Sequence, residues 1–578
     1  MKIHDYIVSF IANKNIKTIF TIPGGGCIFL SDAFAREKSI NVVANHHEQA
    51  CALAAEGYAR ISGKLGVCLV TSGPGGSNAW TGTLCSYQDS VPVMVISGNV
   101  EKKLTTNFTN LNLRQLGDQE FNVVKTVQNF TKYAVQINDP LTIKYHLEKA
   151  YYLALNGRCG PVWIDIPLDI QISEVNPDIL NGYDPEQTEI KKFDIKNLLE
   201  KLLNSKKPLI IVGHGVRLSK SIDILDDLLE LHKIPVITSF NGNDAVSNEY
   251  EYYCGRFGTH AQISANKIVQ SADFVLSLGS RLYVRQIGYR FSEFAKNAYK
   301  IYVDIDNDEL FKPTIFPDMR INLDVKEFLA QIKDLIQLSD ISEWQEFCKE
   351  IVQKYPTVLN RHRNIRPLNA YGVIESLNDH MRSDLPVITS NGSANIVGMQ
   401  VLKLKKNQRL FSNKSTAPMG YGLPAAIGAC FAINKKQILC LEGDGSIHMN
   451  IHELQVVVQN NLPIKIIVFN NDGYLSIKIS QRALCNGHLS LSSSSSGLTL
   501  PNYKKIAKAY GISYKRIKNM NELKKELSKS FNTDIPEFIE VFVEPDGIHE
   551  PRVLAALNRS GKFEQDTLDN IKWLYENI

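Results

Sequence analysis

The sequence predicts an α/β protein whose three domains each contain a doubly wound parallel sheet. Short apolar segments alternate with segments of helical periodicity along most of the chain, and this alternation is typical of parallel sheets covered by helices on both faces. Several apolar segments run directly into glycine-rich turns, where a parallel strand commonly meets the next helix. The length of 578 residues favours three domains of ordinary size.

The composition is that of an ordinary globular chain, with 44% hydrophobic and 21% charged residues. A net charge of +4, without a basic stripe interleaved with aromatic residues, argues against a nucleic-acid surface. No segment approaches the roughly 18 consecutive apolar residues that span a bilayer. The ten cysteines are scattered without a CxxC pair, which predicts reduced thiols in a cytoplasmic protein. Residues 1–17 predict an amphipathic helix and not a signal peptide.

The first predicted domain spans residues 1–172. Two glycine-rich turns, 23–26 and 72–76, each follow a strand, so that Pro23, Gly24 and Gly75 could bring backbone close to a ligand. The turns are also an ordinary way to build α/β units. The expected strands are Thr18–Ile22, Val42–Asn45, Gly66–Thr71, Val93–Ser97 and Val162–Ile166.

Residues 173–190 are polar and contain proline, asparagine and glycine, which predicts a linker. A second α/β domain is expected over residues 191–340. Its first strand runs into Gly213-His214-Gly215 and its last ends at Asp304, a pattern common in Rossmann-like sheets. The expected strands are Leu209–Val212, Pro235–Ser239, Phe274–Leu278 and Lys300–Asp304.

The third predicted domain, residues 366–546, carries the most specific pattern. Two neighbouring parallel strands would bring Asp444 and Asn471 to one edge of a sheet, where ligands bind in open α/β sheets. Their oxygen atoms suit Mg²⁺, and Gly443 and Gly445 would let a phosphate approach the backbone. The alternative is a tight strand-to-helix turn followed by an asparagine-rich turn. The expected strands are Pro386–Thr389, Gln437–Leu441, Lys465–Phe469 and Phe538–Val543.

The spacing of Gly443-Asp444-Gly445 and Asn470-Asn471 resembles the diphosphate-and-metal motif of thiamine-diphosphate enzymes. His47-Glu48-Gln49 and the segments 72–78 and 419–428 resemble the acetohydroxyacid (acetolactate) synthase family in particular. The resemblance extends over nearly the whole chain to about residue 546. It implies a carboligase that decarboxylates pyruvate and passes the two-carbon unit to an acceptor 2-oxo acid. Acetyl transfer to a larger ketone, such as a nucleotide-linked keto sugar, and simple 2-oxo acid decarboxylation remain alternatives.

The resemblance also implies roles for individual residues. Glu48 would hydrogen-bond the aminopyrimidine ring of thiamine diphosphate, and Met419 would be the apolar wedge that holds this cofactor bent. Gln119 lies in a substrate-side loop, in which Asp118 replaces the phenylalanine of the family. Mg²⁺ would be held by Asp444, Asn471 and the carbonyl group of Gly473. The cofactor-binding positions implied are Pro23, Gly24, Gly75, Gly392, Ser393, Ala394, Gly443, Gly445, Ser446, Gly473 and Tyr474.

In this family the central domain holds FAD, although many relatives have an empty central domain. The positions implied for FAD are Gly213, Gly215, Gly258, His260, Gly279, Arg281, Asp304 and Ile305. Arg285 matches the arginine that binds the acceptor carboxylate, with an ordinary surface arginine as the alternative. Gln481 stands where the family has a tryptophan that helps to choose the acceptor.

The family implies a homodimer or homotetramer whose active site lies between subunits. The serine run Ser492–Ser496 predicts either a mobile loop that closes over the site or a disordered insertion. Residues 547–578 form a tail with a weakly amphipathic helix expected around 568–575, which could cap the site or the dimer.

Overall fold

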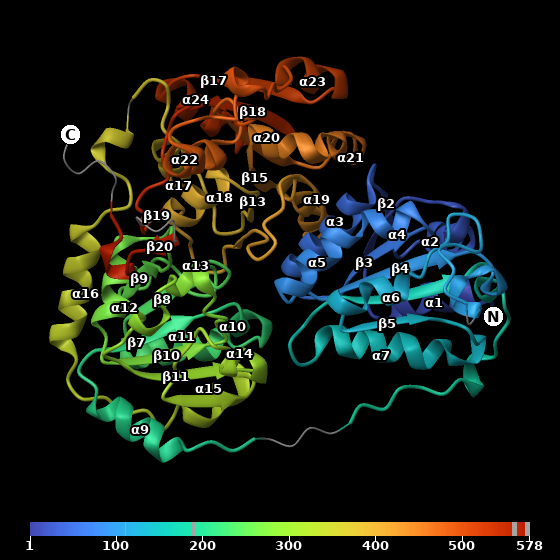
Figure 1. The fold of residues 1–578 in the computed structure, drawn as a ribbon, viewed down its shortest axis with the longest axis horizontal. Helices are drawn as coiled ribbons and strands as arrows, with labels where there is room; N and C mark the ends of the chain where they lie inside the picture. Colours follow the sequence, from blue (N-terminus) through green and yellow to red (C-terminus); the bar gives the residue numbers. More distant parts are fainter. Residues whose placement is uncertain (110, 187–190, 364, 558–562, 573–578) are drawn as a thin grey trace.

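The computed structural model describes residues 1–109, 111–186, 191–363, 365–557 and 563–572. Three six-stranded sheets follow one another along the chain (Figure 1). Every pairing within these sheets is parallel. Helices cover both faces of each sheet, which confirms the predicted fold class.

The first sheet has the order β2-β1-β3-β4-β6-β5. One face is covered by α1, α2 and α7, and the other by α3 and α6, because the apolar side chains of these helices pack on the strands. The strands are β1 (Thr18–Thr21), β2 (Asn41–Ala44), β3 (Gly66–Val70), β4 (Val93–Asn99), β5 (Tyr133–Gln136) and β6 (Val162–Pro167). The helices are α1 (Ile3–Asn13), α2 (Ile28–Arg36), α3 (Glu48–Ser62), α6 (Val123–Val127) and α7 (Ile143–Leu155).

The central sheet has the order β12-β11-β10-β7-β8-β9, in which the strand order reverses between β10 and β7. Helices α12 and α16 cover one face, and α9, α11 and α15 cover the other. The strands are β7 (Pro208–Val212), β8 (Val236–Thr238), β9 (Tyr253–Arg256), β10 (Phe274–Leu278), β11 (Tyr299–Asp304) and β12 (Met319–Asn322). The helices are α9 (Ile195–Asn204), α11 (Ile222–His232), α12 (Ile263–Ser271), α15 (Val325–Ile332) and α16 (Ser342–Lys354).

The third sheet, β14-β13-β15-β16-β18-β17, repeats the strand order of the first. Helices α17, α18 and α24 cover one face, and α19, α21 and α23 cover the other. The strands are β13 (Val387–Thr389), β14 (Leu410–Phe411), β15 (Ile438–Gly443), β16 (Ile464–Asn470), β17 (Ser513–Ile517) and β18 (Glu537–Phe542). The helices are α17 (Ala370–Asn378), α18 (Ser393–Val401), α19 (Gly422–Ala432), α21 (Leu454–Gln459), α23 (Tyr503–Tyr510) and α24 (Met520–Ser530).

The serine run, for which a mobile loop or a disordered insertion was expected, is hydrogen-bonded through its main chain and hydroxyl groups to the turn that follows β16. One expectation about the C-terminal part of the chain needs correction. The helix expected around 568–575 is, within the described residues, a single 3₁₀ turn over Leu568–Asn570. This turn packs on α12 of the central domain, where Asn266 Nδ2 donates to Leu568 O at 3.2 Å.

The first and third domains meet through α3 and α19, which lie side by side in Figure 1. A Cβ atom at Gly428 would lie 1.8 Å from Ala54 O, and one at Gly57 would lie 2.2 Å from Ala425 O. The two helix backbones therefore touch, and only glycine fits at these two positions. Buried side chains of both domains form one continuous apolar cluster around this contact.

Buried charged groups lie where the three domains meet. Arg60 donates to Asp89 at 2.8 Å, and Asp89 also accepts from Lys414 N at 2.9 Å, across the boundary between the first and third domains. Arg409 donates to Asp244 of the central domain at 2.7 Å and to Arg60 O at 2.7 Å. Burial makes an unpaired charge costly, so these contacts hold the three domains in one arrangement.

No helix among the described residues is long and apolar enough to cross a membrane. All ten cysteines are free thiols, and eight of them are buried.

The contact between α3 and α19 predicts a specific effect on stability. Replacing Gly428 by Ala forces a methyl group against Ala54 O and should cost about 1–3 kcal/mol by overpacking. We expect a lower midpoint of thermal unfolding than in the wild type. Gly25→Ala is the matched control, since a Cβ atom there meets nothing within 4 Å. Equal midpoints for Gly428→Ala and the wild type would contradict the close contact.

Candidate active site

The glycine turns singled out in the sequence lie where the strand order of each sheet reverses. Gly24 and Gly75 follow β1 and β3, Gly213 and Gly279 follow β7 and β10, and Gly392 and Gly443 lie at the ends of β13 and β15. In open α/β sheets, ligands bind in the crevice at the carboxyl ends of the strands at such a reversal. The fold therefore offers three crevices, one for each domain.

In the third domain, Asp444 begins the short helix after β15 and is 1% exposed. Its carboxylate accepts hydrogen bonds from the backbone N–H groups of Gly445, Asn471 and Gly473 at 2.7, 2.9 and 3.0 Å. A carboxylate offers about four lone-pair directions, so one remains for a further partner. Burial raises the pKa of Asp444 to about 6. The sequence prediction that Asp444 and Asn471 meet at one sheet edge is confirmed by these contacts.

The turn after β16 presents a second oxygen at the same edge. Asn471 Oδ1 is buried and accepts no hydrogen bond from the described residues. Lys478, on α22 (Leu475–Leu484), fixes this turn from behind, because its ammonium group donates to Asn471 O at 2.9 Å and to Pro545 O at 2.5 Å. Tyr474 covers Gly445, whose Cβ atom would lie 2.3 Å from the tyrosine ring.

Two more turns of the third domain face this edge. Gly392 has φ of +76° and open space at its Cβ position, so its backbone is accessible to a ligand. Its neighbour Ser393 hydrogen-bonds His549 Nε2 at 2.9 Å, and Ala394 is buried in the following helix. Ser446 Oγ contacts Ser390 Oγ at 2.7 Å and accepts from Gly420 N at 3.0 Å. Ser446 therefore holds the turn that carries the half-buried Met419.

The first domain gathers its candidates around Thr71. Cβ atoms at Gly24 and Gly75 would lie 2.5 and 2.8 Å from Thr71, so packing against this side chain already requires both glycines. Pro23 precedes Gly24 in the same turn. The exposed Gln119 lies beside the second turn, since its carbonyl oxygen is 2.4 Å from the Cβ position of Gly73.

Glu48 begins α3 and is 9% exposed. Its Oε2 accepts a hydrogen bond from Asn78 Nδ2 at 2.9 Å. The first turn of a helix favours a carboxylate electrostatically, so Glu48 is held in place by the helix terminus and by one amide.

The start of α3 also contacts the third domain directly. Asn450 Nδ2 lies 3.4 Å from Gln49 Oε1 and donates to Gly420 O at 2.9 Å. Glu453 accepts from Asn45 Nδ2 at 2.8 Å and from His46 N at 2.9 Å. The residues flanking Glu48 and the turn flanking Met419 are thus fixed relative to each other within one chain. Among the described residues, however, no hydrogen bond or ion pair joins the glycine turns around Thr71 to the sheet edge that carries Asp444 and Asn471.

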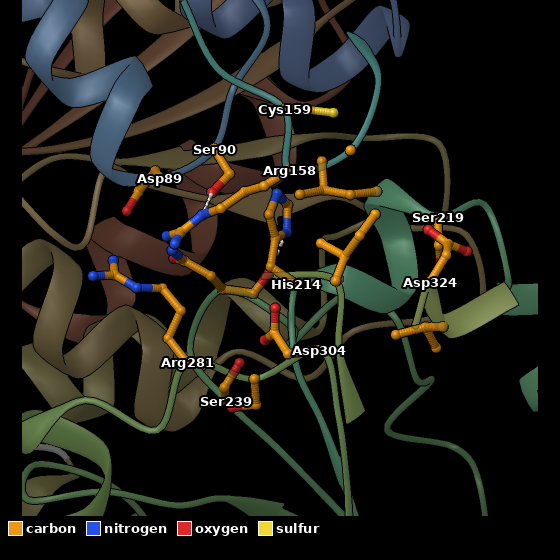
Figure 2. Close-up of a pocket in the computed structure, with 18 of the residues that line it drawn as sticks. Asp89, Ser90, Arg158, Cys159, His214, Ser219, Ser239, Arg281, Asp304 and Asp324 are labelled. Carbon is orange, nitrogen blue, oxygen red and sulfur yellow. Dashed lines mark hydrogen bonds between the residues drawn. The ribbon is translucent and has the colours of Figure 1, made fainter. Parts of the chain in front are cut away.

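The central crevice opens into a cavity of about 600 Å³ that all three domains line. Figure 2 shows Arg281, Arg158, His214 and Asp304 around it, with Arg158 bonded to Ser90. Of the positions implied for FAD, those lining the cavity are Gly215, Gly279, Arg281, Asp304 and Ile305. Gly213 adjoins it, because its Cβ position lies 2.1 Å from Gly279 O.

Charged groups in this cavity are mostly paired. Arg281 donates to Glu309 at 3.0 Å and to Gln88 O at 2.9 Å, and Arg158 donates to Asp306 at 2.7 Å. Burial raises the pKa of Asp304 to about 6. Burial and the nearby Arg285 lower the pKa of Lys414, which also lines the cavity, to about 7.

Other sequence candidates lie elsewhere. Gly258 and His260 are outside the cavity lining; Gly258 N donates to Asn266, and His260 contacts Thr259. The side chain of Arg285 is exposed and has no hydrogen bond or ion pair to the described residues. Gln481 is bonded to the serine run rather than directed at the Asp444 edge.

Sequence analysis missed several residues that shape the site: Thr71, Asn78, Asn450, Glu453, Lys478 and His549. Each acts on a candidate from a different turn or domain. No local sequence pattern marks Thr71, Lys478 or His549 as a site residue. Asn450 and Glu453 lie in the segment that follows the Gly443–Ser446 turn, and could have been included with it.

Glu453 predicts a pH dependence of stability. Burial raises its pKa to about 7, and it faces the backbone N–H of His46 and the ring of His452, whose pKa burial and the nearby His47 and His46 lower. An unfolded glutamate has a pKa of about 4.3, so between these two values the folded chain binds the additional proton. Stability at this position therefore falls as the pH rises from about 4.3 to 7.

Thermal unfolding of Glu453→Gln should accordingly lose less stability between pH 5 and 8 than unfolding of the wild type. Glu200→Gln, at an exposed position on α9, is the control and should follow the wild type. Parallel stability curves for Glu453→Gln and the wild type would show that Glu453 is ionised throughout this range.

Comparison with known proteins agrees with this geometry. Family models of the thiamine pyrophosphate enzymes match the chain in order, namely the N-terminal TPP binding domain over residues 1–125, the central domain over 195–332 and the C-terminal TPP binding domain over 390–541.

The chain is also similar along nearly its whole length to acetolactate synthases. It is 32% identical to the acetolactate synthase large subunit of Lactococcus lactis subsp. lactis, over 96% of this chain and 94% of that protein. It is 31% identical to the large subunit of Pyropia yezoensis, over 92% and 90% of the two chains. It is 30% identical to the chloroplastic acetolactate synthase 1 of Nicotiana tabacum, over 97% and 84%. The chain therefore belongs to the thiamine pyrophosphate enzyme family, among the relatives of the acetolactate synthase large subunits.

Proposed function

We propose that this protein is a thiamine-diphosphate-dependent carboligase of the acetolactate synthase type. It would decarboxylate pyruvate and transfer the two-carbon unit to the carbonyl group of a second 2-oxo acid. The observation that carries the proposal is the paired oxygen edge of Asp444 and Asn471, in a chain similar to acetolactate synthases over almost its full length. When bound, thiamine diphosphate supplies the carbon nucleophile and the electron sink that this chemistry needs.

The residues at the Asp444 edge fit a divalent cation and a diphosphate. One lone-pair direction of Asp444 and the unpaired, buried Asn471 Oδ1 suit a hard cation such as Mg²⁺, and the carbonyl group of Gly473 is proposed as a third ligand. The open backbone at Gly392 and the N-terminus of α18 suit phosphate oxygens. Gly443, Gly445, Ser446 and Tyr474 would complete the walls around the diphosphate.

Glu48 is proposed to accept or donate the proton of a ring nitrogen of the cofactor. The hydrogen bond from Asn78 orients its carboxylate at the start of α3. Met419 would press on the cofactor from the turn that Ser446 holds. Pro23, Gly24, Gly75 and Gln119 would line the same end of the site, and Arg285 would bind the acceptor carboxylate.

We propose FAD as a further cofactor in the central cavity. Its volume of about 600 Å³ and its place at the strand-order reversal between β7 and β10 suit a dinucleotide. Asp304, at the carboxyl end of β11, has the position and chemistry to accept hydrogen bonds from a ribose. Gly258 and His260, which lie outside the lining, are not included in this proposed site.

We also propose a homodimer or a homotetramer, in which a second copy completes the active site. Exposed apolar residues lie next to the proposed site residues of the first domain and of the third domain, and a partner copy would cover them. Five lie in the loop before Gln119: Leu104, Phe108, Leu111, Leu113 and Leu116. Met449 is exposed beside Gly420, next to Met419.

The ten free thiols support a reducing compartment such as the cytoplasm.

A product assay tests the proposed reaction. Purified protein with thiamine diphosphate, Mg²⁺, FAD and pyruvate as the sole substrate should form 2-acetolactate, measured by its conversion to acetoin in acid. Leaving out thiamine diphosphate should abolish the product. Absence of acetolactate above the background of a protein-free control would refute a second pyruvate as the acceptor.

Replacing Glu48 by Gln tests the assigned proton-transfer residue. The amide keeps the size of the side chain but cannot exchange a proton, so turnover should fall by about 10²–10⁴-fold. Thermal unfolding should confirm that the fold is retained, and Glu200→Gln serves as the activity control. A Glu48→Gln variant with wild-type turnover would overturn this assignment.

A further inference from the structure

The serine run packs directly on the turn that carries Asn471. We call residues Ser490–Ser496 the serine loop. Tyr474 N donates to Ser492 O at 2.9 Å, and Ser494 Oγ donates to Asp472 Oδ2 at 2.7 Å. A Cβ atom at Gly473 would lie 2.4 Å from Ser492 O, so the loop and the turn are in backbone contact. The serine loop thus covers the outer side of the turn.

The inner side of the same turn is bonded to Asp444. The N–H groups of Asn471 and Gly473 both donate to Asp444 Oδ2, at 2.9 and 3.0 Å. The turn is therefore clamped between the Asp444 carboxylate and the serine loop. The position of Asn471 Oδ1, which is unpaired at the centre of this clamp, depends on both sides.

The side chain of Gln481, on α22, also fastens the serine loop. Its Nε2 donates to Ser490 O at 2.8 Å, and its Oε1 accepts from Ser492 Oγ at 2.8 Å and from Ser490 N at 3.3 Å. One carboxamide thus makes three hydrogen bonds to two residues of the loop. Lys478, one turn earlier on α22, holds the other end of the turn through Asn471 O.

We propose that Gln481 is a positioning residue for the metal-binding turn, acting through the serine loop, and does not select the acceptor. This inference rests on the proposed function, in which Asp444 and Asn471 hold the cation. The amide nitrogen and carbonyl oxygen of Gln481 are both engaged by the loop, so neither end is directed at a substrate. Partners that orient metal ligands typically change metal affinity by about 10–100-fold when they are removed.

The test compares Gln481→Ala with the wild-type full-length protein in two assays. Calorimetric titration with Mg²⁺ in the presence of thiamine diphosphate should show about tenfold weaker binding in the variant. Saturating Mg²⁺ should restore turnover with pyruvate, because the reacting groups are intact. Digestion of the protein without ligands by chymotrypsin should cut faster at Leu489, Leu491 and Leu498, since these leucines lie in or beside the released loop.

Two further variants distinguish the loss of the hydrogen bonds between Gln481 and the serine loop from general damage to α22. Ser492→Ala removes the hydroxyl bond to Gln481 and a 3.5 Å contact with Ser496 Oγ, and it should change both readouts in the same direction, but less. Ser480→Ala is the matched control, because its hydroxyl bonds only to Ser476 O within α22, and it should behave as the wild type.

The outcomes distinguish this inference from the proposed function. Unchanged Mg²⁺ binding in Gln481→Ala, or unchanged chymotrypsin cleavage, would overturn the positioning role. A changed acceptor preference at unchanged Mg²⁺ affinity would instead make Gln481 a specificity residue. If wild-type protein bound neither Mg²⁺ nor thiamine diphosphate, the proposed function itself would fail, and the metal-positioning role would fail with it.

Discussion

The backbone contact between α3 and α19 determines how the rest of the molecule is arranged. Gly57 and Gly428 let the two helices touch without intervening side chains, and a single apolar cluster surrounds them. Glu48 begins one of these helices, and Met419 lies shortly before the other. A shift of a few tenths of an ångström at this contact would therefore move both proposed catalytic groups. The hydrogen bonds of Asn450 and Glu453 act at the same boundary and limit rotation of α3 about its axis.

The three domains share one structural feature, a reversal of strand order, but surround it with chemically different side chains. Each sheet reverses its strand order at a pair of glycine turns, and each reversal opens a crevice. What differs is the side chains that surround each crevice. The third domain has a buried carboxylate and an unpaired amide oxygen, whereas the first has an oriented glutamate. The central domain has paired charges around a large cavity. This division matches the needs of a cofactor with a charged diphosphate end and a heterocyclic end.

The sequence predicted the interior of the fold much better than its margins. The central strands were predicted because they are continuous apolar runs between glycine turns. Five strands of the three six-stranded sheets were missed, namely β5, β9, β12, β14 and β17. All five lie at sheet edges and have only two to five residues, too few for a long apolar run. Asp444 and Asn471 were predicted because they directly follow central strands. Asn78, Lys478 and His549 were not, since their roles come from contacts between separate elements. The contacts of the serine run with Gln481 were not predicted either, because composition alone does not reveal hydrogen bonds.

The contact at α3 has a consequence for how the chain must fold. Asn45 and Glu453, which join the first and third domains, are 408 positions apart in the sequence. During synthesis the first domain emerges and folds long before its partner helix exists, so the small-residue face of α3 stays exposed to water until the third domain is made. Docking of these helices is then the final, non-local step of assembly. Slow translation would lengthen the interval in which this surface can associate with other nascent chains.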